Sequence, residues 1–533
     1  MADANPRSGP SPRTAAFALA ALTVAFGFAG SRILGVFRTV AIADAFGSSP
    51  ELSAYWVAFR IPDLIFQVIA GATVGSAFIP IFSRVHTREG SDRAWRLASN
   101  VLTVVALGTA VLCLIALIFA PLIVPLTAPG LGEETGQRDE LVDKAVDLTR
   151  LMLLSPLLFS ISGVVTGILN ARQQFLLPAL APMVYNLSII FGAIVLSGPW
   201  GTEGLAVGVV LGALLHLLIQ LPGLAREAMR FRALVDLRDA ATREIGRLMA
   251  PRVFGLGAAQ MNFVITTFFA SRVDDRAIAN ISYAWVIAQL PLALFGMALS
   301  TAMFPRLAEH VARDDRVSMA RGVADTLRTI MFFTVPAVIG LAFLREPITV
   351  LLLQRGEFGP DDAALASAAV AFFCIGVVPQ AGIEIHSRGF YALGDTRTPV
   401  ILAIAAVVIN AMISAALWDP FGIEGLAFAV SAASWAEWGL LYAIYQRRID
   451  PDAFTALESL APVALAAASM AIVLAALSTD MTADGAGDSF AWVLVGSLVG
   501  GLVFGSLSIG FRVPEAMSAV RRLRGLFGRV RDN

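Results

Sequence analysis

Two arginines interrupt the first apolar stretch of the chain, in the segment SRILGVFRTV at residues 31–40. Arg32 and Arg38 carry permanent charges on forked hydrogen-bond donors, which suit a phosphate or pyrophosphate and cannot carry protons near pH 7. Charges inside a membrane span are costly and are kept for function. We therefore predict an anion-binding site at these arginines, with Ser31 and Thr39 beside them.

An alternative places Arg32 outside the membrane. The helix would then end near residue 31, and the side chain would extend to the outer interface. Two features argue against this. The sequence stays apolar through ILGVFRTVAIADAFG, and arginines are disfavoured on the outer side of a membrane.

The length of the first apolar segment, 14–47, predicts an irregular helix. An unbroken helix over this range would be roughly 50 Å long, so it must tilt, bend or break. Gly30 and Gly35 are the predicted hinge positions of this helix, and Pro62 is the predicted hinge position of the next one. In a straight helix Arg32 and Arg38 would point about 120° apart, whereas a break at Gly35 could direct both into one cavity.

A second charged group lies in WVAFRIPDLIF. Arg60 and Asp63 are three residues apart and share a helix face, and Pro62 interrupts the backbone hydrogen bonds between them. We expect this face to open toward a cavity; the alternative is a local ion pair that neutralises both charges. Arg388, in GIEIHSRGFYALGD, is a further candidate for binding, and its alternative is an interfacial position at the end of a span.

Composition identifies an integral membrane protein of the all-α class. The chain is 57% hydrophobic and only 15% charged, with a mean hydropathy of +0.75. A spanning helix needs about 20 apolar residues, because its backbone must satisfy its own hydrogen bonds in hydrocarbon. Fourteen spans are predicted, near 14–47, 51–83, 97–125, 146–171, 178–198, 202–225, 244–271, 277–305, 326–344, 363–390, 398–418, 422–446, 459–478 and 489–511.

An enzyme is not expected. The sequence contains no metal-ligand cluster, nucleophile–base set or phosphate loop, so neither a metal nor another resident cofactor is predicted. Cys113 and Cys374 lie in separate spans, which fits buried side chains better than a disulfide. We expect membrane lipids as partners and no nucleic acid.

Arginines gather in alternate connections, at 84–96, 226–247 and 306–321, and in the tail after 511. The intervening connections are poorer in positive charge and often acidic. The positive-inside rule then places both termini in the cytoplasm, in agreement with an even number of spans.

An internal repeat divides the chain. PWGTEGLAVG at 199–208 matches PFGIEGLAFA at 420–429, an offset of 221 residues from 199 to 420. Two six-helix lobes, 14–225 and 244–447, are predicted in the same orientation, related by a pseudo-twofold axis along the membrane normal. The remaining segments are a tail at 1–13, a cytoplasmic linker at 226–243, two extra helices in 459–511 and a basic tail at 512–533. This plan is typical of transporters that work by alternating access.

Several motifs resemble those of one family. SRILGVFR, VAFRIPDL followed by SAFIPIFSR, ILNARQQFLLPALAPMVYN, LLQRGEFGPDD and GFYALGDTRTP are similar, in order, to the bacterial lipid II flippases, the MurJ (MviN) family of the multidrug/oligosaccharidyl-lipid/polysaccharide exporter superfamily. The resemblance implies a multi-pass protein of the bacterial cytoplasmic membrane. It would export undecaprenyl-pyrophosphate-linked peptidoglycan precursor, with the headgroup in a cationic central cavity and the lipid tail along the last two helices. It leaves the coupling ion or membrane potential unidentified and makes the cell-wall synthesis machinery a candidate partner.

Arg32 and Arg38 match two cavity arginines of that family, but other positions depart from it. Thr39 replaces an acidic residue, and Phe66, Gln67 and Val286 occupy positions of further arginines. We expect Arg60 or Arg388 to compensate.

These departures leave two alternatives open. The first is a flippase for another polyprenyl-linked oligosaccharide. The second is a cation-coupled drug antiporter, whose embedded carboxylates would be Asp44, Asp63 and Glu437.

Overall fold

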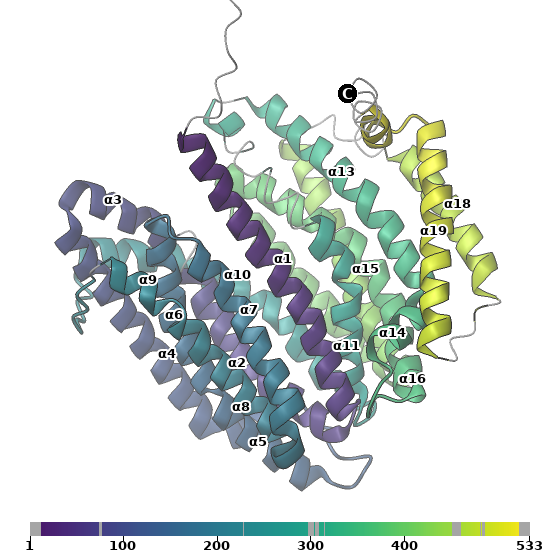
Figure 1. Ribbon diagram of the computed structural model, residues 1–533, viewed down its shortest axis with the longest axis horizontal. Coiled ribbons are helices and arrows are strands. Elements are labelled where there is room, and N and C mark those ends of the chain that lie inside the picture. Colours follow the sequence, from purple (N-terminus) through teal and green to yellow (C-terminus); the bar gives the residue numbers. More distant parts are fainter. Residues whose placement is uncertain are drawn as a thin grey trace, which may run out of the picture. The chain divides into compact units, whose positions relative to one another are not determined.

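The computed structural model describes residues 12–73, 77–227, 229–296, 303, 307, 309–313, 315–449, 460–479, 481 and 485–521. Within these ranges every element is helical, which confirms the all-α fold class. The helices are labelled in Figure 1, and their bounds are α1 (Pro12–Phe46), α2 (Pro50–Thr73), α3 (Ile79–Glu89), α4 (Ser91–Thr127), α5 (Arg138–Met152), α6 (Leu154–Ala171), α7 (Leu176–Phe191), α8 (Ser197–Leu218), α9 (Leu221–Arg226), α10 (Ala240–Ala270), α11 (Ala277–Ala288), α13 (Arg316–Phe343), α14 (Arg345–Leu353), α15 (Pro360–Ala392), α16 (Arg397–Arg448), α18 (Ala461–Ser478) and α19 (Ala486–Gly510). Two short π-helical segments, Gly192–Leu196 and Leu292–Gly296, complete the list.

In the described residues, ten helices are long and apolar enough to cross a membrane, which makes the chain a multi-pass membrane protein. Two of these stretches, Leu176–Arg226 and Arg397–Arg448, are 51 and 52 residues long. That is more than twice the length that one crossing requires. The count of fourteen spans stays a prediction.

Both long stretches break at equivalent positions of the repeat. Gly201 has φ 55° and ψ −137°, and Gly422 has φ 54° and ψ −137°. This conformation favours glycine because a Cβ atom would be strained there. The breaks fall where the sequence predicts the boundaries between the fifth and sixth helix of each copy, so the two copies share their backbone geometry at this turn.

Contacts between residues divide the chain into two compact units. Unit 1 comprises 1–45, 50–127 and 135–260, and unit 2 comprises 46–49, 128–134 and 261–533. The two units divide within α10, at residues 260–261. The repeat predicts the boundary earlier, in the linker at 226–243. The repeat-based lobes at 14–225 and 244–447 stay predictions.

Unit 1 has a core at one end of its helices. Phe78 and Phe82 of α3 stack with ring centroids 5.3 Å apart, and Trp95 of α4 lies 5.6 Å from Phe82. Ala241 and Ile245, at the start of α10, are buried in the same cluster. The first turns of α10 are therefore packed against α3 and α4.

Unit 2 is built around α13, α15 and α16. The two last helices, α18 and α19, pack against each other; α18 contacts α13, and α19 contacts α14 (Figure 1, yellow-green and yellow). Beyond α19, Glu515 Oε1 accepts a hydrogen bond from Arg328 Nε of α13 at 2.6 Å. This bond fixes the segment after the last helix to the core of unit 2.

Unit 2 also holds two connections from the first half of the chain. The Tyr283 hydroxyl donates to the Gly47 carbonyl at 2.8 Å, and the Ser48 hydroxyl donates to Asp362. In the second connection, the Gly132 N–H donates to Asp275 Oδ1 at 2.6 Å. The ends of α1 and α4 thus lead into loops that belong to unit 2.

Candidate functional site

A cavity of about 340 Å³ lies within unit 1, among α1, α2, α6, α7 and α8. Ligand pockets usually measure about 300–1,000 Å³, so this space suits a small group or part of a larger ligand. One cation, one anion and several neutral polar groups share the lining with aromatic rings; the lining residues are Arg38, Ile42, Tyr55, Trp56, Phe59, Pro62, Asp63, Phe66, Gln67, Ser155, Phe159, Pro182, Tyr185, Ile189 and His216.

Helix α2 supplies the longest wall of the cavity. Trp56, Phe59 and Asp63 are spaced by three and four residues, and Phe66 and Gln67 follow Asp63 by three and four, which places all of them on one side of the helix. All five line the cavity. The local helical period therefore positions both the aromatic wall and the carboxylate.

Asp63 is the acidic group of the cavity and has three neighbours. Gln67 donates a hydrogen bond to it, and the guanidinium groups of Arg60 and Arg38 attract it electrostatically. Asp63 and Arg38 line the cavity, whereas Arg60 is not among the lining residues. Asp63 thus lines the cavity and is also attracted by Arg60, so the structure contains elements of both alternatives, and a role of this pair in binding stays a prediction.

Pro62 contributes to the same face. It has no N–H, so the carbonyl of Ala58 loses its usual helical donor. The Thr149 hydroxyl of α5 lies 3.5 Å from that carbonyl and donates to the Ala145 carbonyl at 2.7 Å. A neighbouring helix thus covers the gap that the proline leaves.

Helix α1 is continuous from Pro12 to Phe46. It does not break at Gly35, and the two arginines take different directions, as a straight helix predicts. Arg38 is half-buried and lines the cavity, whereas Arg32 is exposed, with its guanidinium carbon 5.2 Å from the centroid of the Phe28 ring. The hinge function of Gly30, Gly35 and Pro62 stays a prediction.

Packing of α1 on α7 explains the continuity. A Cβ atom at Gly30 would lie 2.8 Å from Met183 Cε, so a glycine allows this close approach. Asn186 Nδ2 donates to the carbonyl and the hydroxyl of Ser31 at 3.2 and 3.3 Å. The Thr39 hydroxyl donates to the Gly35 carbonyl at 3.1 Å. Ser31 therefore joins α1 to α7, and Thr39 bonds to the backbone of its own helix.

Arg388 lies in unit 2, on α15. Its Nε and Nη2 donate to Glu384 Oε1 at 3.0 and 2.5 Å. The pair is one helical turn apart, so part of the charge of Arg388 is already compensated on its own helix.

Comparisons with known proteins agree with this architecture. A sequence model of the family described as "Lipid II flippase MurJ" matches residues 42–496. The chain belongs to the lipid II flippase MurJ family. A family member from Burkholderia cenocepacia is 32% identical over 412 residues, covering 76% of this chain and 79% of the relative. The probable lipid II flippase MurJ of Rhizobium meliloti is 29% identical over 428 residues, covering 78% of each chain.

Solved structures show the same fold. A lipid II flippase MurJ in an inward closed conformation gives a TM-score of 0.76 at 24% identity, covering 93% of this chain and 99% of that structure. An inward-facing multidrug transporter of the wider superfamily gives 0.64 at 17% identity, covering 78% and 95%. At these identities the likeness concerns the fold alone.

Two of the positions where the resemblance implies arginines, Phe66 and Gln67, line the unit 1 cavity. The Phe66 ring packs against Phe159 with centroids 4.7 Å apart, and Gln67 bonds to Asp63. Val286, the third such position, lies in α11 of unit 2. All three positions carry neutral side chains in this chain, and the expectation of arginines there rests on the resemblance alone.

Sequence reasoning missed the aromatic wall and His216. The spacing of Trp56, Phe59 and Phe66 on one helix face could have revealed the wall. His216 lines the cavity, and its Nδ1 lies 2.7 Å from the Ser162 hydroxyl. No periodicity links His216 to Ser162, so only the packing of α6 against α8 shows this contact.

No metal centre is visible in the part of the chain that the structure describes, where no three histidine, cysteine or acidic side chains are grouped for a metal ion. The charged side chains that line the cavity are Arg38 and Asp63, and neutral polar side chains accompany them. This set suits reversible binding of an anion through charge-assisted hydrogen bonds.

Proposed function

We propose that this chain moves lipid II, the undecaprenyl-pyrophosphate-linked peptidoglycan precursor, from the inner to the outer leaflet by alternating access. Membership of the MurJ family supports this proposal. The observation that carries the residue-level proposal is the position of Arg38, which faces the unit 1 cavity from α1.

Arg38 is proposed to bind the pyrophosphate. In the unliganded cavity its guanidinium attracts Asp63, which Gln67 and Arg60 also stabilise. An incoming pyrophosphate competes with Asp63 for Arg38, and Asp63 keeps its other two neighbours when it loses that attraction. Binding is then reversible, which a transporter requires.

Arg32, on the exposed side of α1, is proposed to contact the same headgroup in a cationic central cavity. The cavity of unit 1 is too small for a whole lipid-linked saccharide, so it would take only part of the headgroup. We also propose that both termini lie in the cytoplasm and that the lipid tail of the substrate lies along the last two helices. The cell-wall synthesis machinery is a candidate partner.

Flipping of labelled lipid II by the full chain in proteoliposomes tests the proposal. Loss of a charged hydrogen bond costs about 1.5–3 kcal/mol, so Arg38→Ala should weaken substrate binding about 10- to 100-fold, and Arg38→Lys less. Arg150→Gln is the control, because Arg150 is exposed and pairs with Asp147 at 3.3 Å. Normal flipping by Arg38→Ala protein that reaches the membrane would refute the proposal.

The same assay tests compensation by the other arginines. Arg60→Ala and Arg388→Ala should each reduce flipping if these residues replace the missing family arginines. Normal transport by both variants would remove that hypothesis and leave Arg32 and Arg38 as the binding pair.

A second candidate is a flippase for another polyprenyl-linked oligosaccharide. The neutral Phe66 and Gln67 favour it, because they replace charged contacts that the resemblance implies. Proteoliposomes that contain a different polyprenyl-linked saccharide discriminate the two, since faster flipping of that lipid than of lipid II supports the second candidate. If the chain were a cation-coupled drug antiporter, proteoliposomes that contain no lipid-linked saccharide would still show export of a drug.

A further inference from the structure

The segment between α9 and α10, residues 229–239, forms a strap along the end of α4. It has no helical structure and lies wholly in unit 1. Arg230, Phe231 and Arg232 lie near the start of the strap, and Leu237 and Arg238 lie near its end. The strap therefore combines apolar and basic side chains within a few residues.

The backbone of the strap is bonded to α4. The side-chain amide of Asn100 pairs with both backbone groups of Asp236, donating to its carbonyl at 2.8 Å and accepting from its N–H at 2.7 Å. The Arg232 N–H donates to the Ser99 hydroxyl at 3.2 Å. Because main-chain groups make these bonds, the side chains of the strap remain available for other contacts.

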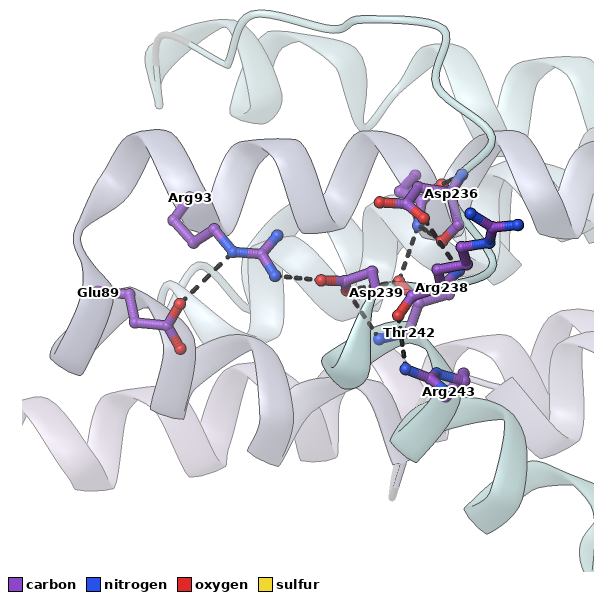
Figure 2. A network of polar contacts seen from close by, with 8 residues as sticks. Glu89, Arg93, Asp236, Arg238, Asp239, Thr242 and Arg243 are labelled. Carbon is purple, nitrogen blue, oxygen red and sulfur yellow. Dashed lines mark hydrogen bonds and ion pairs between the residues drawn. The ribbon is translucent and has the colours of Figure 1, made fainter.

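The end of the strap is fixed by charge. Figure 2 shows Asp239 between Arg93, with which it forms an ion pair, and Thr242, whose N–H and hydroxyl both donate to Asp239 Oδ2 at 2.9 Å. Asp239 thus caps α10, and Arg93 in turn pairs with Glu89 at 3.4 Å. The strap is therefore held at three points, Arg232, Asp236 and Asp239.

The apolar side chains of this fixed strap are exposed. Phe231, Val235 and Leu237 are 54%, 59% and 61% exposed, and Leu234 is 36% exposed. Folded proteins rarely leave such a group of apolar side chains in water without a partner, so an apolar environment is expected around them.

The strap lies beside the residues at which α4 changes from a charged to an apolar sequence. Asp92, Arg93 and Arg96 occur before Asn100, and no charged residue occurs from 101 to 127. Ser99 and Asn100 therefore mark the boundary between the polar end of the helix and its membrane-spanning part. A segment bonded to these residues is placed at the depth of lipid headgroups.

Three arginines accompany the apolar side chains. Arg230, Arg232 and Arg238 are exposed. Of the two acidic residues of the strap, Asp236 accepts a hydrogen bond from the Arg238 N–H at 2.9 Å, and Asp239 is paired with Arg93 of α4. A basic and apolar segment at headgroup depth is complementary to a membrane surface that contains anionic lipids.

We propose that the strap is a lipid-binding surface, in which Phe231, Leu234, Val235 and Leu237 insert among the headgroups and Arg230, Arg232 and Arg238 bind anionic phospholipids. This role is separate from the binding of the transported lipid. It holds the start of α10 at a constant depth, because Asp239 connects the strap directly to that helix.

Fluorescence of the full chain in nanodiscs tests the proposal. An environment-sensitive label on Val235→Cys reports the strap, since the native Cys113 and Cys374 are buried, and wild-type protein measures background labelling. The expected result is quenching by lipids that carry a nitroxide on the headgroup. A label on Gln137→Cys, in an exposed polar connection, is the control and should be quenched much less.

Charge selectivity is measured with the nitroxide on phosphatidylglycerol or on phosphatidylcholine. Each arginine near an anionic surface strengthens binding about fivefold. The wild-type strap should therefore favour phosphatidylglycerol, and R230Q/R232Q/R238Q should abolish the preference while Arg150→Gln keeps it. Equal quenching by both lipids in the wild type would overturn the assignment to anionic lipid. A label unaffected by either lipid, yet shielded from aqueous iodide, would show that protein covers the strap and would overturn the proposal.

Discussion

At the residue scale, the charged side chains of unit 1 differ in what surrounds them. Arg38 and Asp63 face a cavity, whereas Asp239 is enclosed by donors at the surface. Burial disfavours ionisation of Asp239, but hydrogen bonds from the Thr242 N–H and the Arg93 guanidinium outweigh it, and the pKa of this carboxyl falls below its ordinary value. The ionised form of Asp239 therefore stabilises the fold.

This shift predicts a pH dependence of stability. A carboxyl whose pKa is lowered by folding contributes stability above the unfolded pKa of about 3.9 and loses it as the pH falls through the folded value. Asp239→Ala, which removes the helix cap and the partner of Arg93, should cost about 2 kcal/mol near neutral pH. Thermal unfolding in detergent should show the difference from wild type shrinking in acid.

Asp236→Ala is the matched control for that experiment. Asn100 bonds to the backbone of residue 236 rather than to its carboxylate, and among the described residues the carboxylate accepts only one exposed hydrogen bond, from the Arg238 N–H at 2.9 Å, so this variant should lose much less stability than Asp239→Ala. A loss of stability in Asp239→Ala that is the same at all pH values would contradict the role of the ionised carboxylate.

At the element scale, two glycines allow long helical stretches to turn back. Gly201 and Gly422 have the same positive φ and occupy the same place in the repeat. Close packing follows each break. A Cβ atom at Gly204 would lie 2.3 Å from the Leu196 carbonyl, and one at Gly425 would lie 2.6 Å from the Leu417 carbonyl. The motif shared by both copies thus encodes a sharp turn and the contact that follows it.

Substitutions in both copies test whether Gly201 and Gly422 are required for the turn. Gly201→Ala and Gly422→Ala should each lower the stability by roughly 1–3 kcal/mol, because alanine is strained at this φ. Gly198→Ala and Gly439→Ala are matched controls, since both are helical and nothing lies within 4 Å of the added Cβ atom. The controls should be neutral or slightly stabilising. Equal effects at all four positions, measured by thermal unfolding, would refute the assignment.

At the scale of the whole molecule, the fold and the family agree, and the substrate depends on a few side chains. The fold is shared with a lipid II flippase and with a multidrug transporter. Fold alone therefore does not select the substrate, so the proposal assigns that selection to side chains such as Arg38, Phe66 and Gln67.

Rescue of a bacterial strain depleted of its own lipid II flippase tests function in the cell. Expression of this chain should restore growth, and Arg38→Ala should fail to do so at equal abundance in the membrane. Absence of rescue by membrane-inserted wild-type protein, together with flipping of another polyprenyl-linked saccharide in liposomes, would favour the second candidate.

Hydropathy, charge and motif spacing in the sequence determined the all-α membrane class, the internal repeat and the family, and they made Arg38 a candidate for binding. These properties are local or periodic, so they can be read along the chain. Only the tertiary structure decided that Arg38 lines the unit 1 cavity while Arg32 lies outside that cavity, that His216 joins the cavity lining, and that the strap exposes its apolar side chains. The physical reason is packing, since each of these outcomes depends on contacts between helices that are far apart in the sequence.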